Sequence, residues 1–592
     1  MTSGSSHEQV ALGPARADRG DATVPTTTRD DRVAGSALWA AYGDALGFIS
    51  ELTDTQGLKL RTRGRELTTP LSWSRRIGGR QGVTVTLPEG CYSDDTQLRL
   101  STGRAIGPKG FDVEAFAKVE LPVWPAYALG GGKGTKAAAA HLGRDQALWY
   151  ANDFPGWTEG GGNGAAMRIQ PHVWAATELS EPSSYLPDVL RNAVTTHGHP
   201  AGIVGAALHA QAVAHAISAG TVPSPADVAS QLDVVRGLLK SLRGDPQLGE
   251  IWLRMWEHSA GRKLDVAWED EVATASAALK DAVLAVEQKG PSDERYAAML
   301  HRLALFEPAR RGSGTLTALA ALGLAWLETD PVRAIQIAAK AVGSDTDTIA
   351  TMAGAILGAV VAEGPLAPVL DADVIEREAL RLARLSGGGH EAGHRYPDLL
   401  HWSAPRTQSD VIGLCGGRLV VSGLGGADPL PGDAIAARQG DFVWQWVKLQ
   451  VGPTLLIKSR KELREIHPWA LPVSKTLDRG PADRDLREVE ELKLLDAVEN
   501  AAVSGEPERT RPAQGDRGVH RPLPPTKLDR GVELQAVLDW LSHQGYDSNE
   551  AIGYVVRRVA RDGTPDQLAM LMGMLREQLR RFPTSQSPQA GT

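Results

Sequence analysis

Two acidic clusters stand out among the residues of this 592-residue chain that could do chemistry. One lies at residues 93–97 (SDDTQ) and the other at residues 343–348 (GSDTDT), and each directly precedes a segment of helical composition. Carboxylates are favoured there, because the first turn of a helix exposes unpaired amides and the positive end of the helix dipole. Four carboxylates and the hydroxyls of Ser93 and Thr348 form an all-oxygen ligand set, which suits Mg²⁺ or Mn²⁺ rather than zinc.

Either cluster taken alone is explained as an ordinary helix cap, since Asp and Ser are preferred N-cap residues. The presence of two such clusters in one chain is harder to explain by helix capping alone. If the two clusters meet in space, they could hold two metal ions about 3.5–4 Å apart and activate a water molecule. The residues alone leave both interpretations open.

Two further segments could contribute to a binding site. Residues 160–168 (GGGNGAAMR) form a glycine-rich stretch, and consecutive glycines let backbone amides approach a phosphate closely. Residues 195–200 (TTHGHP) place His197 and His199 directly before an apolar helix. Alternatively, the glycine-rich stretch is only a flexible loop, and the two histidines have only a structural role at the start of the helix.

The elements that must position these residues are helices. Residues 33–385 have helical lengths and abundant Ala, Val and Leu, and no alternation of strands and helices is evident. Stretches such as 201–219 are apolar nearly all round, which indicates helices buried inside a larger helical domain. We therefore expect an all-α core with a multi-helix architecture.

The rest of the chain differs in character from this core. Short β-prone runs separated by Gly and Pro predict a small β-rich subdomain after it, and apolar residues at helical spacing predict a helical segment further on. The predicted segments are a disordered tail at 1–32, the helical domain at 33–385, the β-rich subdomain at 386–472, a linker at 473–530, the helical segment at 531–583 and a tail at 584–592.

Composition excludes several classes of protein. The formal net charge of −8 disfavours a general nucleic-acid coat protein. Two cysteines, Cys91 and Cys415, cannot build a disulfide framework or a cysteine-rich zinc site, and they favour a reducing cytoplasmic location. No leader-like pattern is evident at the N-terminus, and the longest nearly apolar run, 349–362, is shorter than the about 20 residues that span a bilayer. We expect a cytoplasmic protein without a membrane segment.

Several motifs, taken in order, carry a resemblance to a known family. They are Gly43–Gly47 (GDALG) with Glu51, 93–97, Gly162-Asn163-Gly164 with Met167-Arg168, Thr196-His197, and 345–348. Over residues 33–385 this order resembles the ADP-ribosylglycohydrolases, or ADP-ribosylhydrolases, which include the dinitrogenase reductase-activating glycohydrolases. The resemblance implies an orthogonal all-α fold with two Mg²⁺ ions (Mn²⁺ being possible) in a central cleft.

The resemblance also implies an activity and roles for residues. The activity is hydrolysis of the N- or O-glycosidic bond that joins ADP-ribose to a modified protein, nucleic acid or small molecule. Glu51, on a flap near the metals, and Asp94 and Asp347 would be catalytic. The implied metal ligands are Ser93, Asp94, Asp95, Asp345, Asp347 and Thr348, with Asp347 bridging the two ions, and the implied diphosphate site is Gly162, Asn163 and Gly164, with His197 close by. Ser93 replaces the threonine of many members, and Gln170 replaces an alanine.

Two other functions remain open at this stage. One is a protein that acts by binding, either an ADP-ribose-binding protein or an immunity protein that neutralises a toxin. It would occupy its partner through the C-terminal region and keep only a vestigial site. The other is a metal-dependent phosphoesterase. A complete set of metal-ligating residues argues against a vestigial site, and the identity of the product would separate the two hydrolases.

Three patterns are interpreted as coincidental. Residues 390–394 (HEAGH) match a zinc-protease motif, but three preceding glycines and Gly393 make the required helix improbable. Residues 130–136 (GGGKGTK) lack the spacing of a phosphate-binding P-loop, and Cys91 is interpreted as a small packing residue.

Residues 57–80 form a strongly basic segment with seven Lys or Arg side chains, one Glu and Trp73. Because the segment lies between Glu51 and Ser93, we expect a loop at the mouth of the cleft. Such a loop could contact a nucleic acid or a phosphorylated target, and a solvated loop without a partner is the alternative.

Overall fold

The computed structural model describes residues 27–79, 82–144, 147–389, 391–399, 402–438 and 440–472, and parts of the C-terminal region at 537–538, 540–541, 549–562, 567–568 and 570–575. The chain divides into two compact units, residues 1–474 and 475–592. Most of the predicted N-terminal tail, all of the predicted linker 473–530 and the predicted tail 584–592 lie outside the described residues.

The first helix, α1 (Arg29–Ser50), begins inside the segment predicted as a disordered tail, so the predicted boundary at residue 33 is wrong. Thr28 and Asp31 form a capping box, in which each side chain accepts a hydrogen bond from the other residue's backbone amide. Both residues are polar and lie before the apolar stretch that begins at Val33. Their composition therefore resembles that of the preceding tail, although they form the start of the helix.

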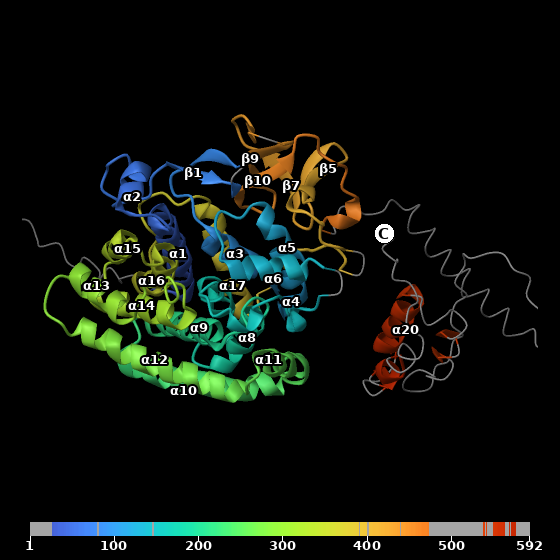
Figure 1. The fold of residues 1–592 in the computed structure, drawn as a ribbon, viewed down its shortest axis with the longest axis horizontal. Coiled ribbons are helices and arrows are strands. Elements are labelled where there is room, and N and C mark those ends of the chain that lie inside the picture. The colour runs from blue at the N-terminus through green and yellow to red at the C-terminus, as the bar shows by residue number, and fades with distance from the viewer. Residues whose placement is uncertain are drawn as a thin grey trace, which may run out of the picture. The chain divides into compact units, whose positions relative to one another are not determined.

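Helices α1 and α16 (Thr346–Val361) run antiparallel in close contact (Figure 1). Their backbones approach so closely that a Cβ atom on Gly35 would lie 2.4 Å from the carbonyl oxygen of Gly358, and one on Gly47 would lie 2.4 Å from that of Thr346. Only glycine fits at such positions. The C-terminal end of α1 is thereby brought beside the N-terminus of α16, which places Glu51 next to the second acidic cluster.

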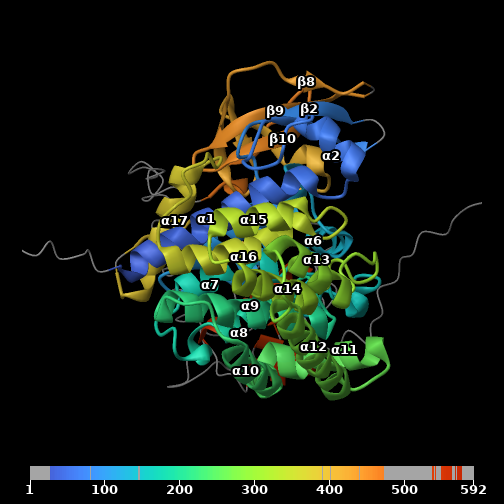
Figure 2. The same ribbon diagram turned by 90° about the vertical axis from the view of Figure 1, so that its left-hand side faces the viewer.

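The remaining helices complete a mostly helical domain, which confirms the predicted fold class (Figure 2). Helices α9 (Pro200–Ala219) and α14 (Gly314–Leu327) are buried nearly all round, and α10 (Pro225–Gly244) and α12 (Leu264–Val286) bury one face each. The others are α2 (Thr55–Thr62), α3 (Asp94–Arg104), α4 (Val113–Ala115), α5 (Leu121–Val123), α6 (Lys133–Leu142), α7 (Gln170–Trp174), α8 (Leu186–Val194), α11 (Leu253–Ala260), α13 (Ser292–Arg302), α15 (Pro331–Lys340) and α17 (Ala372–Ser386).

Helix α9 is the one helix of the described residues that is long and apolar enough to cross a membrane by length and composition. In this fold 89% of the apolar stretch of α9 is buried inside the protein. The same composition is expected of a helix at the centre of a helical core, and α9 contacts α14, α16, α8 and α10.

Two short antiparallel hairpins interrupt the helices in the described part of this domain, so it is not purely α-helical. One joins β1 (Trp73–Ile77) to β2 (Val83–Leu87), and the other joins β3 (Ile106–Gly107) to β4 (Gly110–Phe111). In the first, Val83, Val85 and Leu87 are buried and the two threonines between them are exposed. This alternation is typical of a strand with one face on the core.

The predicted β-rich region forms an antiparallel sheet of six described strands in the order β10-β9-β7-β6-β5, with β8 paired to β9. The strands are β5 (Ile412–Cys415), β6 (Arg418–Val421), β7 (Gly425–Pro429), β8 (Ile435–Ala436), β9 (Phe442–Leu449) and β10 (Thr454–Arg460). Its buried side chains, including Trp444 and Val447, belong to the same hydrophobic core as the helices. The sheet is therefore packed onto the helical domain, with β2 beside β8 (Figure 2).

Asp371 joins the sheet to the helical domain. Its carboxylate accepts hydrogen bonds from the hydroxyl of Tyr92 (2.9 Å) and from the backbone amide and hydroxyl of Thr454 on β10 (2.6 and 2.7 Å). Lys448 on β9 pairs with the same carboxylate at 2.5 Å. Because Tyr92 precedes Ser93, this buried carboxylate connects the sheet to the turn that carries the first acidic cluster.

Replacing Asp371 by alanine is expected to destabilise the protein by about 2–4 kcal/mol, because several buried donors lose their acceptor at once. Thermal denaturation of the full chain measures the effect. Asp373→Ala is the matched control, since Asp373 lies two residues further along and its ion pair with Arg377 is exposed. Equal melting temperatures for the two variants would contradict this role of Asp371.

In the C-terminal unit the described residues are helical, and they include α20 (Asn549–Asp562). Val537, Leu541, Val555, Val559, Leu571 and Leu575 form a small apolar cluster. These residues fall within the segment predicted as helical, 531–583.

Candidate active site

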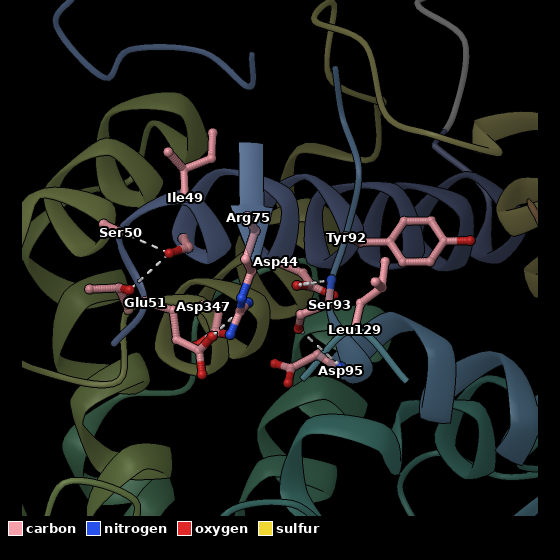
Figure 3. A network of polar contacts seen from close by, with 12 residues as sticks. Asp44, Ile49, Ser50, Glu51, Arg75, Tyr92, Ser93, Asp95, Leu129 and Asp347 are labelled. Carbon is pink, nitrogen blue, oxygen red and sulfur yellow. Dashed lines mark hydrogen bonds and ion pairs between the residues drawn. The ribbon is translucent and has the colours of Figure 1, made fainter. Parts of the chain in front are cut away.

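The first acidic cluster is held in place by Asp44, a buried residue of α1. Its carboxylate accepts a hydrogen bond from the amide of Ser93 at 2.8 Å (Figure 3). It also accepts hydrogen bonds from the amide and hydroxyl of Thr96 at 2.9 and 2.6 Å. Ser93 caps α3, and its hydroxyl oxygen accepts a hydrogen bond from the amide of Asp95 at 3.2 Å. Asp44 belongs to the GDALG motif, and the sequence alone assigned it no role. Its position inside an apolar helix is nevertheless a signal, because a buried carboxylate requires hydrogen-bond partners.

The two acidic clusters meet in the structure. The hydroxyl of Thr348, in the first turn of α16, lies 3.5 Å from Oδ1 of Asp95. The other oxygen of that carboxylate, Oδ2, is buried and has no hydrogen-bond partner. The amide of Thr348 donates to Oδ1 of Asp347 at 3.0 Å, so the N-terminus of the helix orients the second cluster.

The glycine-rich segment is connected to the same site. Asn163 donates one hydrogen bond from Nδ2 to Oδ2 of Asp345 (2.9 Å) and one to the hydroxyl of Thr317 (3.2 Å). His197 lies against Gly162 and Gly164, where an added Cβ would sit within 3.6 Å of the imidazole ring. The structure therefore brings the predicted diphosphate residues beside the predicted metal ligands.

His197 is uncharged in this environment. Burial and the nearby Arg168 guanidinium lower the pKa of His197 to about 3. Its Nδ1 is within 2.7 Å of the hydroxyl of Thr196, which also accepts a hydrogen bond from Arg168 at 2.8 Å. The Thr196 hydroxyl thus connects the His197 ring to the Arg168 guanidinium.

A cavity of about 520 Å³ adjoins the glycine-rich segment. Its lining includes Gly160–Gly162, His199, Gly312 and Ser313. His199 serves as the N-cap of α9, with Nδ1 accepting from the amide of Ala201 at 3.1 Å, so its role is structural. Gly312 and Ser313, to which the sequence analysis gave no role, also line the cavity, and the backbone of Ser313 pairs with that of Gly162.

Buried like charges dominate the electrostatics of the site. Burial, followed by the neighbouring carboxylates, raises the pKa of Asp95 and of Asp347 well above the usual value. Burial and the charge of Asp44 raise the pKa of Asp94 to about 6, against a lowering effect of Lys136. Burial also raises the pKa of Glu51 to about 7, although Arg75 acts in the opposite direction.

The chemistry of the donor set fits a divalent cation. A buried carboxylate oxygen without a partner and several carboxylates that repel each other are stabilised when a cation binds among them. Among the residues that the structure describes, no group of three or more acidic, histidine or cysteine side chains already has the geometry of a metal site. The residue types fit Mg²⁺, and the ligand positions are a proposal taken up below.

The family model for ADP-ribosylglycohydrolase matches residues 25–390, a range that contains every site residue described above. The chain belongs to the ADP-ribosylglycohydrolase family. This confirms the resemblance found in the sequence. Members of the family typically use Mg²⁺ and act on ADP-ribosylated substrates.

A solved structure described as an "ADP-ribosylglycohydrolase-related protein complex" is 22% identical, with a TM-score of 0.39, over 61% of this chain and 100% of that chain. No curated protein matches this chain. The sheet at 412–460 lies beyond the part of the chain that the family model covers.

The basic segment 57–80 is not the loop that the sequence suggested. It contains α2 and strand β1, and Trp73 is buried with its ring 5.3 Å from that of Phe48, so this indole is not exposed for stacking on a base. Arg61 donates to the backbone oxygens of Ile49 and Glu51 at 2.9 and 2.7 Å. Arg75 pairs with the Glu51 carboxylate. Contact with a nucleic acid through the other basic residues of this segment stays a prediction.

The coincidental motifs are explained by their surroundings. Glu391–His394 lack helical structure, His390 lies outside the described residues, and Nε2 of His394 pairs with Glu378 at 3.1 Å. Cys91 is buried, and burial raises the pKa of its thiol, which fits a packing role. The 130–136 segment contributes in another way, because Gly130 packs directly on the Asp94 carboxylate.

Proposed function

We propose that this protein is a Mg²⁺-dependent hydrolase that cleaves the glycosidic bond between ADP-ribose and a modified target. The observation that supports it most is the placement of Glu51, with a pKa raised to about 7, beside the acidic residues that Asn163 connects to the glycine-rich segment. In this proposal a base of near-neutral pKa, a cation site and a phosphate site lie together, an arrangement that suits hydrolysis of an ADP-ribosyl bond.

In this proposal each group has one task. Ser93, Asp94, Asp95, Asp345, Asp347 and Thr348 hold two Mg²⁺ ions, for which Mn²⁺ can substitute. When bound, such ions position ribose hydroxyls and lower the pKa of a water molecule. Backbone amides at Gly162–Gly164 bind the diphosphate, and the neutral His197 lies beside these glycines without adding charge.

Glu51 acts as the general base of the proposed reaction. It accepts a proton from water, whose oxygen forms a bond to the anomeric carbon of the ribose. The bond to the leaving group breaks, and its electron pair goes to the leaving atom, which takes up a proton from the solvent. The carboxylate also favours the positive charge that develops on the ribose in the transition state.

A panel of ADP-ribosylated substrates tests this function. Arginine, serine, thymine and guanine adducts are incubated with the full chain and Mg²⁺, and the products are identified by mass spectrometry. Free ADP-ribose from at least one adduct is expected. Release of phosphate or AMP would indicate a phosphoesterase, and tight binding without turnover would indicate a binding or immunity protein; either result would overturn the proposal.

A further inference from the structure

Glu271 places a carboxylate on the buried face of α12. The other buried residues of this helix are apolar and follow helical spacing: Leu264, Ala267, Trp268, Val272, Ala275, Ala278, Leu279, Ala282 and Ala285. Glu271 is only 9% exposed, and its side chain forms no hydrogen bond or ion pair with any residue that the structure describes. Because a buried carboxylate is costly without donors, this one is suited to accept hydrogen bonds from a bound molecule.

The carboxylate belongs to the cavity that adjoins the glycine-rich segment. Glu271 and Thr274, one turn apart on α12, line the same cavity of about 520 Å³ as Gly160–Gly162. The imidazole ring of His199 is close to both walls. Its Nδ1 would be 3.0 Å from a Cβ on Gly161, and the charge of Glu271 opposes the lowering of the pKa of His199 by burial.

The glycine-rich segment connects the acidic clusters to this cavity. Asn163 donates a hydrogen bond to Asp345, whereas Gly160–Gly162 line the cavity. Among the lining residues that the structure describes, none belongs to the acidic clusters. ADP-ribose is a linear molecule in which the diphosphate joins the reacting ribose to adenosine. If the reacting ribose lies at the acidic clusters and the diphosphate on Gly162–Gly164, the ribose of the adenosine enters the cavity next.

We propose that Glu271 recognises the adenosine ribose of ADP-ribose by accepting hydrogen bonds from its 2′- and 3′-hydroxyls, and that it disfavours ADP-ribose with a phosphate at the 2′ position. This inference rests on the function proposed above. The two oxygens of a carboxylate match the two hydroxyls of a ribose, a pairing by which dinucleotide-binding sites select the unphosphorylated sugar. A 2′-phosphate replaces a donor by negative charge, which the carboxylate repels.

Two other charged residues, Glu159 and Arg310, line the cavity, and both are exposed. A pairing of Arg310 with a 2′-phosphate would have the opposite effect on specificity. Burial favours the effect of Glu271, because water and salt weaken the charge of an exposed side chain much more than that of a buried one. The preference for one of the two ligands therefore reports which residue acts on the ribose.

The test is the affinity of the full chain for free ADP-ribose and for 2′-phospho-ADP-ribose, measured by isothermal titration calorimetry with Mg²⁺. The wild type should bind ADP-ribose at least about tenfold more tightly, since a tenfold ratio corresponds to a modest difference in binding free energy. Glu271→Gln keeps the size of the side chain and removes its charge. This variant should lower the ratio of the two Kd values about tenfold, chiefly through tighter binding of the 2′-phosphorylated ligand.

Two analogues of ADP-ribose distinguish the ribose from the base as the group that Glu271 contacts. One lacks the 2′-hydroxyl of the adenosine ribose, and the other carries hypoxanthine in place of adenine and so lacks the 6-amino group. The wild type should bind the deoxy analogue more weakly than ADP-ribose and the hypoxanthine analogue equally well. The reverse order would assign Glu271 to the base and overturn the inference.

Glu269→Gln is the matched control. Glu269 lies two residues earlier on α12, pairs with Arg236 and has a side chain that is 53% exposed. This variant should leave every Kd unchanged, and thermal denaturation shows whether both variants are folded.

Equal binding of the two ligands by the wild type, tighter binding of 2′-phospho-ADP-ribose, or an unchanged ratio in Glu271→Gln would overturn the inference. Because the chain would still bind ADP-ribose, these results would leave the proposed function intact. Failure of the wild type to bind ADP-ribose at all would contradict both the proposed function and the inference. The measurement does not depend on turnover, so loss of hydrolysis alone would not affect it.

Discussion

Replacing Asp347 by alanine is expected to lower the turnover of an ADP-ribosylated substrate at least about a hundredfold, because the variant loses a central carboxylate of the proposed cation site. The fold should not lose stability. Asp347 is buried beside Glu51, Asp345 and Asp95, and this repulsion disfavours its charged form. Removing it relieves the repulsion, so the melting temperature without Mg²⁺ should stay the same or rise.

Steady-state rates and thermal denaturation of the same Asp347→Ala preparation measure both quantities. Asp373→Ala, which removes an exposed carboxylate from the first turn of α17, is the control and should change neither. Nearly normal rates for Asp347→Ala would show that the acidic clusters are not where the chemistry occurs. A large loss of stability would show instead that Asp347 is a structural cap.

Glu51→Gln is expected to lower kcat by about a hundredfold to ten-thousandfold, in the range typical of a lost general base. The affinity for free ADP-ribose should change little, because a proton acceptor acts mainly in the transition state. Turnover and the Kd from isothermal titration calorimetry are the two measurements. Equal losses in both would make Glu51 a binding residue.

The pH dependence of the rate gives an independent check of Glu51. A base works when it is deprotonated, and the pKa of Glu51 is raised to about 7 by burial. The rate of the wild type should therefore rise as the pH increases through about 7, and it should be lower on the acidic side. Glutamine does not titrate, so the residual rate of Glu51→Gln should lack this rise. The same rise in both proteins would assign the titration to another group.

Much of the helical domain could be predicted from the sequence, because long runs rich in Ala and Leu leave few alternatives. Helix α9 is an example, predicted at 201–219 and found at Pro200–Ala219. The start of α1 could not be placed as well, since Thr28 and Asp31 act as caps only once the helix exists. The β1–β2 hairpin was not predicted, although residues 83–87 (VTVTL) alternate apolar and polar residues as a strand does. The basic residues that precede this stretch are equally typical of a solvated loop.

The composition of the acidic clusters pointed to a site, but their meeting depends on contacts that no local pattern contains. The close approach of α1 and α16 through glycines brings Glu51 to Asp347 across nearly 300 residues of sequence. Arg75 was counted as one charge in a basic segment, and its pairing with Glu51 depends on the register of β1 with β2. The family resemblance, rather than periodicity or composition, assigned roles to these residues.

The measurement that tests the central claim most directly is the release of free ADP-ribose from the best substrate of the panel, with Mg²⁺ and with a chelator. The proposed site predicts steady release of ADP-ribose with Mg²⁺, a fall to the uncatalysed level when the metal is removed, and recovery when Mg²⁺ is restored. Release that continues unchanged in the chelator, or a product other than ADP-ribose, would contradict it.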